Sequence, residues 1–248
     1  MSKQDGIAGP ALILASRSIM GNPDVYAKHS PFSLWGLTLE AESAPDQPPM
    51  KQTFIVRLGE EAGVLTFASA LDAEIYCQHL AASGVAGWQR ERLERIDLSG
   101  VLAAIPEQQQ RLMLSLGFYA SDSNDLLADD SQSLVTPLLP VQFDLRQRRH
   151  GLRQLRIGTD IPAFVHHWWG SIGGENYGQQ IGALEHDSES AISQCATEAL
   201  RKIHITGISD YLHTWTMEGM SEIYALYRPD TGEWGFRPLR HEPARQLH

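Results

Sequence analysis

Apolar and polar positions recur with different periods along the chain, so the sequence predicts both strands and helices. Residues 53–58 and 64–67 are rich in apolar side chains and flank a glycine-containing turn, a pattern typical of a β-hairpin. Ser69 can cap a following helix with Asp72 in its first turn, and Gly84 stands where a left-handed helix end belongs. The apolar stripe of this helix consists of Ala73, Tyr76, Cys77 and Leu80.

The middle of the chain is predicted to be mainly extended. A charged strand at 88–98 precedes an apolar strand around 112–118, and the Ser- and Asp-rich stretch at 121–133 indicates a solvated loop. Residues 135–145 and 152–157 can then pair as a second hairpin. We expect the elements between residues 53 and 118 to form a β-β-α-β unit with further strands.

A second amphipathic helix and a series of strands complete the chain. Asp187 or Ser188 begins the helix, and Arg201 and Lys202 suit the negative end of its dipole. The buried stripe of this helix comprises Ile192, Cys195, Ala196, Ala199, Leu200 and Ile203. Three strands separated by turn-forming residues follow, as in an antiparallel meander. These strands are 211–217, 222–227 and 233–236.

These elements predict an α+β fold with small, mostly antiparallel sheets, each packed by one main helix, and a C-terminal β-meander. We expect residues 1–50 to form an extended N-terminal segment. Residues 51–147 and 148–248 are then two α+β subdomains, or parts of one continuous domain. A chain of 248 residues is long enough to bury a substantial core without disulfide or metal staples.

The charge balance bears on the kind of partner. The net charge of −10 disfavours binding to nucleic acid or to an anionic membrane and favours a basic protein partner. The acidic excess lies mostly before residue 148. Two cysteines are too few for a disulfide framework, and no signal-like or membrane-length apolar run occurs. We therefore expect a cytoplasmic protein, although proteins exported by leaderless routes look the same.

The segment 164–178 concentrates aromatic, histidine and glycine residues, and we expect it to offer large aromatic side chains beside a pliable loop. In one interpretation Trp168, Trp169 and Tyr177 contact a partner protein. In the alternative interpretation they line a cleft with His166, His167 and Glu175, where a histidine acts as acid or base or a small ligand binds. A third interpretation assigns one tryptophan to the core and the other to the cover of a sheet edge.

A second candidate surface is rich in arginine. Five of the 20 basic residues lie between positions 146 and 156, where a hairpin gathers them into a local patch. Those expected to contact a partner are Arg146, Arg148, Arg149 and Arg153. Guanidinium groups can grip carboxylate or phosphate groups, but such a patch is also typical of a charged sheet face that discourages edge pairing.

The chain carries no recognisable catalytic, metal or cofactor motif. Cys77 and Cys195 lie on apolar helical stripes, which indicates packed, unreactive thiols. The adjacent His166 and His167 do not have the spacing of two ligands to one metal.

The sequence leads us to expect a bacterial-type interaction factor, inhibitory or immunity-like, that binds a specific and basic protein partner. An enzyme or ligand-binding protein using the 164–178 cleft, and a structural subunit of a larger assembly, are the alternatives.

Overall fold

The computed structural model describes residues 12–15, 33–41, 50–103, 105–147, 153–158, 160–208 and 223–238. The strand expected at 211–217 lies outside these residues, as do Arg148 and Arg149. In the described part the fold is α+β, as predicted from the sequence.

The larger sheet contains seven strands and is antiparallel except for the parallel pair β4–β6. Its strands are β1 (Leu12–Ala15), β2 (Trp35–Ala41), β3 (Met50–Leu58), β4 (Glu61–Phe67), β5 (Trp88–Arg92), β6 (Gln110–Ser115) and β9 (Leu138–Val141). They follow the order β1-β3-β2-β4-β6-β9, and β5 pairs with β2. The predicted first hairpin is confirmed as β3–β4, and Gly59 takes the positive φ of 60° that its tight turn requires.

The smaller sheet contains five strands in the order β12-β8-β7-β13-β14. They are β7 (Phe118–Ala120), β8 (Leu126–Ala128), β12 (Ile205–Gly207), β13 (Ile223–Arg228) and β14 (Glu233–Pro238). Two of them precede residue 148 and three follow it. The prediction of a solvated loop at 121–133 was wrong for β8, because this short apolar run is buried and pairs with β12. The predicted turn between the last two strands is confirmed by the β13–β14 hairpin.

Five α-helices and two short 3-10 turns are present in the described residues. The helices are α1 (Ala70–Ala82), α2 (Leu98–Leu102), α3 (Asp160–Gly173), α4 (Tyr177–His186) and α5 (Glu189–Arg201). The turns are η1 (Leu93–Arg95) and η2 (Glu107–Gln109). The strand expected at 88–98 therefore ends at Arg92, where the chain turns into η1 and α2. None of the helices in this part of the chain has the length and apolar character needed to cross a membrane.

The caps predicted for α1 and α5 are confirmed. The Ser69 hydroxyl accepts a hydrogen bond from the Asp72 backbone N–H at 3.2 Å, and Gly84 takes a φ of 90° just after α1. At α5, the Ser188 hydroxyl accepts from the Ala191 backbone N–H at 3.1 Å. Both helices thus begin where a local sequence signal places them.

The pliable loop expected within 164–178 is instead mostly helical. Val165, Trp169 and Gly173 recur every fourth residue and are buried, so packing along one helix face outweighs the low helix propensity of glycine. A β-carbon on Gly173 would lie 2.4 Å from the Tyr177 ring, so the glycine allows α3 and α4 to approach closely. The short break between them contains Gly174, whose φ is 98°.

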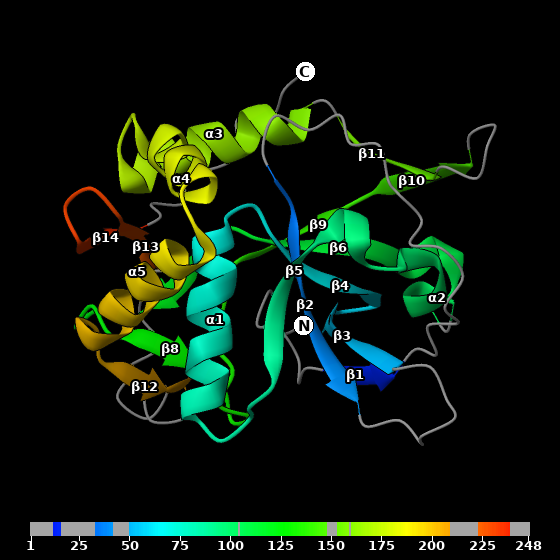
Figure 1. The fold of residues 1–248 in the computed structure, drawn as a ribbon, viewed down its shortest axis with the longest axis horizontal. Coiled ribbons are helices and arrows are strands. Elements are labelled where there is room, and N and C mark those ends of the chain that lie inside the picture. Colours follow the sequence, from blue (N-terminus) through cyan, green and yellow to red (C-terminus); the bar gives the residue numbers. More distant parts are fainter. Residues whose placement is uncertain are drawn as a thin grey trace, which may run out of the picture.

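Helices α1 and α5 lie side by side between the two sheets, and α3 packs on β13 and β14 (Figure 1). The predicted second hairpin is confirmed in part, because β10 (Phe143–Gln147) and β11 (Arg153–Ile157) form a separate two-stranded sheet. Residues 138–141, expected in its first strand, instead form β9 and pair with β6 of the larger sheet. In Figure 1 this hairpin extends from the larger sheet near α2. The chain leaves the sheet at Gln142, since β9 pairs with β6 whereas β10, among the described strands, pairs with β11 alone.

Candidate functional site

The aromatic residues of 164–178 do not share one surface. Trp169 and Tyr177 are buried, with ring centroids 5.6 Å apart in an edge-on contact, so both belong to the core. Trp168 is half-buried, and its indole N–H donates to the Leu116 carbonyl at 2.8 Å. Its ring stacks against Phe164, which is 41% exposed. Of the three aromatic side chains predicted to contact a partner, only that of Trp168 reaches toward the surface.

The polar residues predicted for the same segment all lie on the surface. His166, His167 and Glu175 are exposed. The rings of His166 and Trp169 make an edge-on contact, with their centroids 5.8 Å apart. No group of three histidine, cysteine, aspartate or glutamate residues able to hold a metal occurs in the described part of the chain. Of the two histidines, His166 contacts the buried Trp169–Tyr177 pair.

The strand pairing of the backbone shows where part of the arginine-rich patch lies. Arg146 and Arg153 lie on the two strands of the β10–β11 hairpin, opposite Gln154 and Gln147 respectively. Arg148 and Arg149 fall outside the described residues. Arg156 is exposed and stands opposite Asp144 in the same hairpin.

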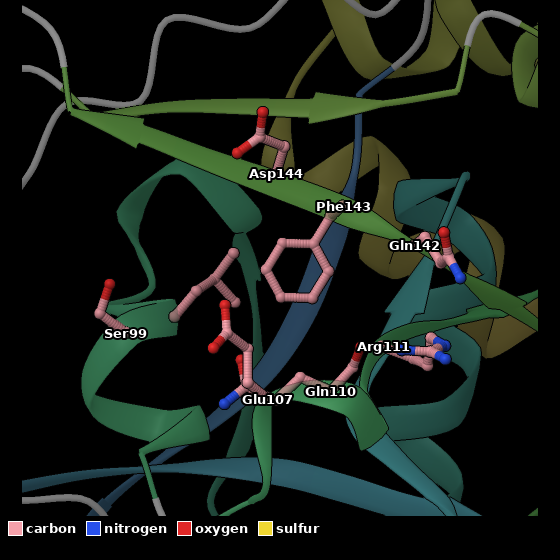
Figure 2. Close-up of a pocket in the computed structure, with 8 residues that line it drawn as sticks. Ser99, Glu107, Gln110, Arg111, Gln142, Phe143 and Asp144 are labelled. Atoms are coloured by element: carbon pink, nitrogen blue, oxygen red, sulfur yellow. Dashed lines mark hydrogen bonds between the residues drawn. The ribbon is translucent and has the colours of Figure 1, made fainter.

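An open groove of about 490 Å³ lies beneath this hairpin (Figure 2). Its walls come from β10, α2, η2 and the start of β6. The residues that line it are Leu98, Ser99, Glu107, Gln110, Arg111, Gln142, Phe143 and Asp144. The groove forms where the chain departs from the larger sheet at Gln142, so that β10 stands away from η2.

Local hydrogen bonds fix the lower wall of the groove. The Asp97 carboxylate accepts from the Gly100 backbone N–H at 3.1 Å and caps the short helix α2. The Gln110 amide nitrogen donates to the Leu102 carbonyl at 3.0 Å and to the Ile105 carbonyl at 2.8 Å. Both amide hydrogens of Gln110 are thereby used, and its remaining polar atom, Oε1, is an acceptor.

The arginine of the groove is neutralised within the protein. Arg111 Nε donates to Glu61 Oε1 at 2.8 Å, and Arg111 Nη1 donates to the Gln110 carbonyl at 2.8 Å. The Arg111 side chain is only 15% exposed. Its charge and two of its five N–H donors are therefore committed to the fold.

Glu107 contrasts with Arg111. Its side chain is exposed on η2 and makes no hydrogen bond or ion pair with another residue in the described part of the chain. Figure 2 shows the Phe143 ring extending from β10 toward Glu107, while the Asp144 side chain points to the other side of the strand. The groove thus combines an aromatic wall with an uncompensated carboxylate.

No protein-family model, curated protein or solved structure matches this chain. Evidence for its function therefore comes from its own side chains.

A second polar cluster lies sealed between α1 and α4. Asp72 is 2% exposed, and burial, followed by the nearby charge of Glu185, raises its pKa from 3.8 to about 7. Burial also raises the pKa of Tyr177 well above its ordinary value, with a contribution from the negative charge of Asp72. Among the described residues, Asp72 Oδ1, the Tyr177 hydroxyl and Gln180 Oε1 have no hydrogen-bond partner.

Glu185 connects this cluster to the larger sheet. Its Oε1 accepts from the Trp35 indole N–H at 3.1 Å and from the Ala70 backbone N–H at 2.9 Å. The carboxylate therefore satisfies a donor on β2 and one of the free N–H groups at the start of α1. It also brings a second acidic group close to Asp72.

Both thiols are covered by the fold, Cys77 fully and Cys195 in part. Burial, and then the charge of Glu74, raises the pKa of Cys77 to about 12. Burial also raises the pKa of the half-buried Cys195. Neither group is a thiolate near neutral pH, so neither suits a nucleophilic role.

Sequence reasoning missed both the groove and the sealed cluster. The sequence contains a polar run at 107–110, but this run does not indicate that Phe143 lies across a groove from it. That arrangement depends on the pairing of β6 with β9, in which Leu112 is opposite Val141. The contact between Trp35 and Glu185 joins residues 150 positions apart.

Proposed function

We propose that this chain is a cytoplasmic protein-binding factor, inhibitory or immunity-like, that acts by occupying a basic surface of a partner protein. The observation that carries the proposal is the groove beneath the β10–β11 hairpin, where Glu107 is exposed and uncompensated while Arg111 is paired. The net charge of −10 supports it, because an acidic protein attracts a basic partner over a distance.

The shape of the groove favours a protein partner over a small metabolite. Small-molecule sites are usually enclosed and lined mostly by apolar side chains. This groove is open, and most of its lining residues are polar. Phe143 supplies one aromatic contact at its centre, as in interfaces where a ring is surrounded by polar groups.

The alternative of an enzyme or ligand-binding cleft at 164–178 has less support. Trp169 and Tyr177 are part of the core, whereas His166 and His167 are exposed. A surface role for this segment rests on Trp168 and its neighbour Phe164, which stack with ring centroids 6.1 Å apart. That aromatic pair is the second place where a partner protein can contact the chain.

Affinity capture of the full-length chain from its own cytoplasm tests the proposal. The bound protein is identified, purified and titrated against the wild type, Phe143→Ala and Trp168→Ala. We expect a stoichiometric complex that is weakened at least tenfold by Phe143→Ala, because a central aromatic contact is lost. Glu60→Gln is the control, since it removes one exposed charge at the β3–β4 turn.

The outcomes separate the candidate surfaces. A complex weakened only by Trp168→Ala moves the interface to α3. A chain that captures no partner, and whose folding is verified by a cooperative thermal transition, contradicts the proposal.

A further inference from the structure

We propose that the groove beneath the β10–β11 hairpin accepts an arginine side chain of the partner, with its guanidinium at Glu107 and Gln110 Oε1 and its stem on Phe143. This inference rests on the proposed function and specifies the chemistry that its site recognises. Four observations lead to it.

The first observation is the balance of donors and acceptors. Gln110 has used both amide hydrogens on the Leu102 and Ile105 carbonyls, which leaves Oε1 as its open polar atom. Glu107 contributes two further acceptor oxygens without a partner among the described residues. A ligand that matches this wall must therefore donate hydrogen bonds.

The second observation is the sign of the charge. The Arg111 guanidinium is paired with Glu61, and its side chain is mostly covered. Ser99 and Asp144 each have an interaction within the protein. The uncompensated charge at the groove is that of Glu107, so an anionic ligand would meet repulsion and a cationic one attraction.

The third observation is the Phe143 ring, which is half-buried and directed into the groove (Figure 2). The face of an aromatic ring attracts a cation, and the methylene stem of a long basic side chain packs well on it. A purely polar cationic ligand would leave this apolar surface unused. A basic amino-acid side chain uses both the ring and the acceptors.

The fourth observation separates arginine from lysine. A guanidinium is planar, carries five N–H donors and can stack on a ring while it donates to a carboxylate. The groove offers acceptors on Glu107 and Gln110 and a ring on the opposite wall, which matches that combination. A lysine ammonium is a compact charge that cannot stack in this way. The volume of about 490 Å³ also leaves room for residues that flank the arginine in a peptide.

The probe for this inference is a capped Gly/Ser nonapeptide with one central arginine. Matched peptides carry lysine or citrulline, the neutral urea analogue of arginine, at the same position. Binding to the full chain is followed by NMR titration of backbone amides. We expect the arginine peptide to perturb amides in 98–111 and 142–144. The citrulline peptide should bind about tenfold more weakly and the lysine peptide about threefold more weakly.

Two variants assign the contact to its residues. Glu107→Gln keeps the shape of the wall but removes the charge, so we expect affinity for the arginine peptide to fall about fivefold, as for an exposed ion pair. Phe143→Leu keeps an apolar side chain but removes the ring face, and should weaken the arginine peptide more than the citrulline peptide. Glu60→Gln should leave the affinity unchanged, and the thermal transition of each variant shows that it is folded.

Equal affinity for arginine and citrulline peptides overturns the inference, as does equal affinity for arginine and lysine. Amide shifts confined to residues outside 98–111 and 142–144 also overturn it. Its failure is distinct from failure of the proposed function. A captured partner that binds Glu107→Gln as well as the wild type leaves the function standing and removes the arginine site. Specific binding of the arginine peptide without any captured partner supports the arginine site and contradicts the proposed function.

Discussion

Two polar clusters of this protein are similar in chemistry but differ in their access to water. The groove presents the carboxylate of Glu107 and the amide oxygen of Gln110 at the surface. The cluster between α1 and α4 encloses an Asp72 oxygen and the Tyr177 hydroxyl, which have no hydrogen-bond partner among the described residues. An open acceptor can remain charged until a cationic partner arrives, whereas an enclosed carboxyl lowers its free energy by holding a proton.

The comparison shows that unsatisfied acceptors have different consequences at different depths. At the surface they favour recognition and contribute little to the free energy of folding. In the interior they couple folding to pH, because burial opposes the charged form.

Asp72→Asn should remove a large part of the pH dependence of stability. The folded chain holds the Asp72 proton up to about pH 7, whereas the unfolded chain releases it near pH 4. Unfolding therefore releases the Asp72 proton between these values, so the contribution of Asp72 to stability falls as pH rises through this window and is constant above it. The difference between the folded and unfolded pKa values of Asp72 corresponds to a change of about 4 kcal/mol in the free energy of unfolding. Urea unfolding between pH 4 and 8 measures it.

In that experiment the difference between Asp72→Asn and the wild type isolates the contribution of Asp72. The variant should gain stability relative to the wild type as pH rises. Asp187→Asn, which changes an exposed carboxyl after α4, should follow the wild-type curve. Parallel curves for wild type and Asp72→Asn would show that Asp72 does not hold a proton in the folded state.

Glu185→Ala should reduce the free energy of unfolding by about 2 kcal/mol at pH 8. The buried Trp35 indole and the Ala70 N–H both lose their acceptor, and an unmet buried donor is costly. Glu185→Gln keeps an acceptor while removing the charge, so its loss should be smaller. Both variants should lower the pKa of Asp72, which Glu185 helps to raise. Urea titrations at several pH values measure both effects.

Tyr177→Phe should leave stability unchanged or raise it by about 1 kcal/mol. The Tyr177 hydroxyl is buried and has no hydrogen-bond partner in the described part of the chain, so its removal relieves a desolvation cost. The ring itself, which packs on Trp169, is retained. A thermal melt at pH 7 measures the change. A loss of more than 1 kcal/mol would mean that the hydroxyl is satisfied in the folded protein.

Glu107→Gln should have the smallest effect on folding, within about 0.5 kcal/mol of the wild type from pH 5 to 8. The side chain is exposed and supports no internal contact among the described residues. Its effect should appear in partner binding instead. A clear loss of stability would show that the groove wall depends on this carboxylate, and the contrast with Asp72 would disappear.

The parts of the fold that follow from local signals were predictable from the sequence. These parts depend on residues that are close together in the sequence. They are the Ser69 and Ser188 caps, the turn at Gly59 and the β10–β11 hairpin. Helix α3 was not predicted, because its glycines favour a loop until contact with α4 outweighs that preference. Strand β8 was not predicted either, because it lies in a polar stretch and its partner β12 is distant in sequence.

The candidate sites could not be predicted because no local signal specifies them. Asp72 has the sequence position of an ordinary first-turn residue, and only the arrival of α4 places Glu185 and Tyr177 beside it. Phe143 is simply the first residue of a strand until the β6–β9 pairing brings β10 over η2. Trp169 was expected to be a candidate contact because of its type, but its helical spacing placed it in the core.

The smaller sheet also has a consequence for synthesis on the ribosome. Strand β7 pairs with β13, which is synthesised about 100 residues later. The edge of β7 that binds β13 therefore stays unpaired for about 5–20 s at ordinary rates of translation. Phe118, which is fully buried in the finished sheet, is exposed for that interval. The topology therefore requires an apolar segment in the middle of the chain to wait for the last strands before it is covered.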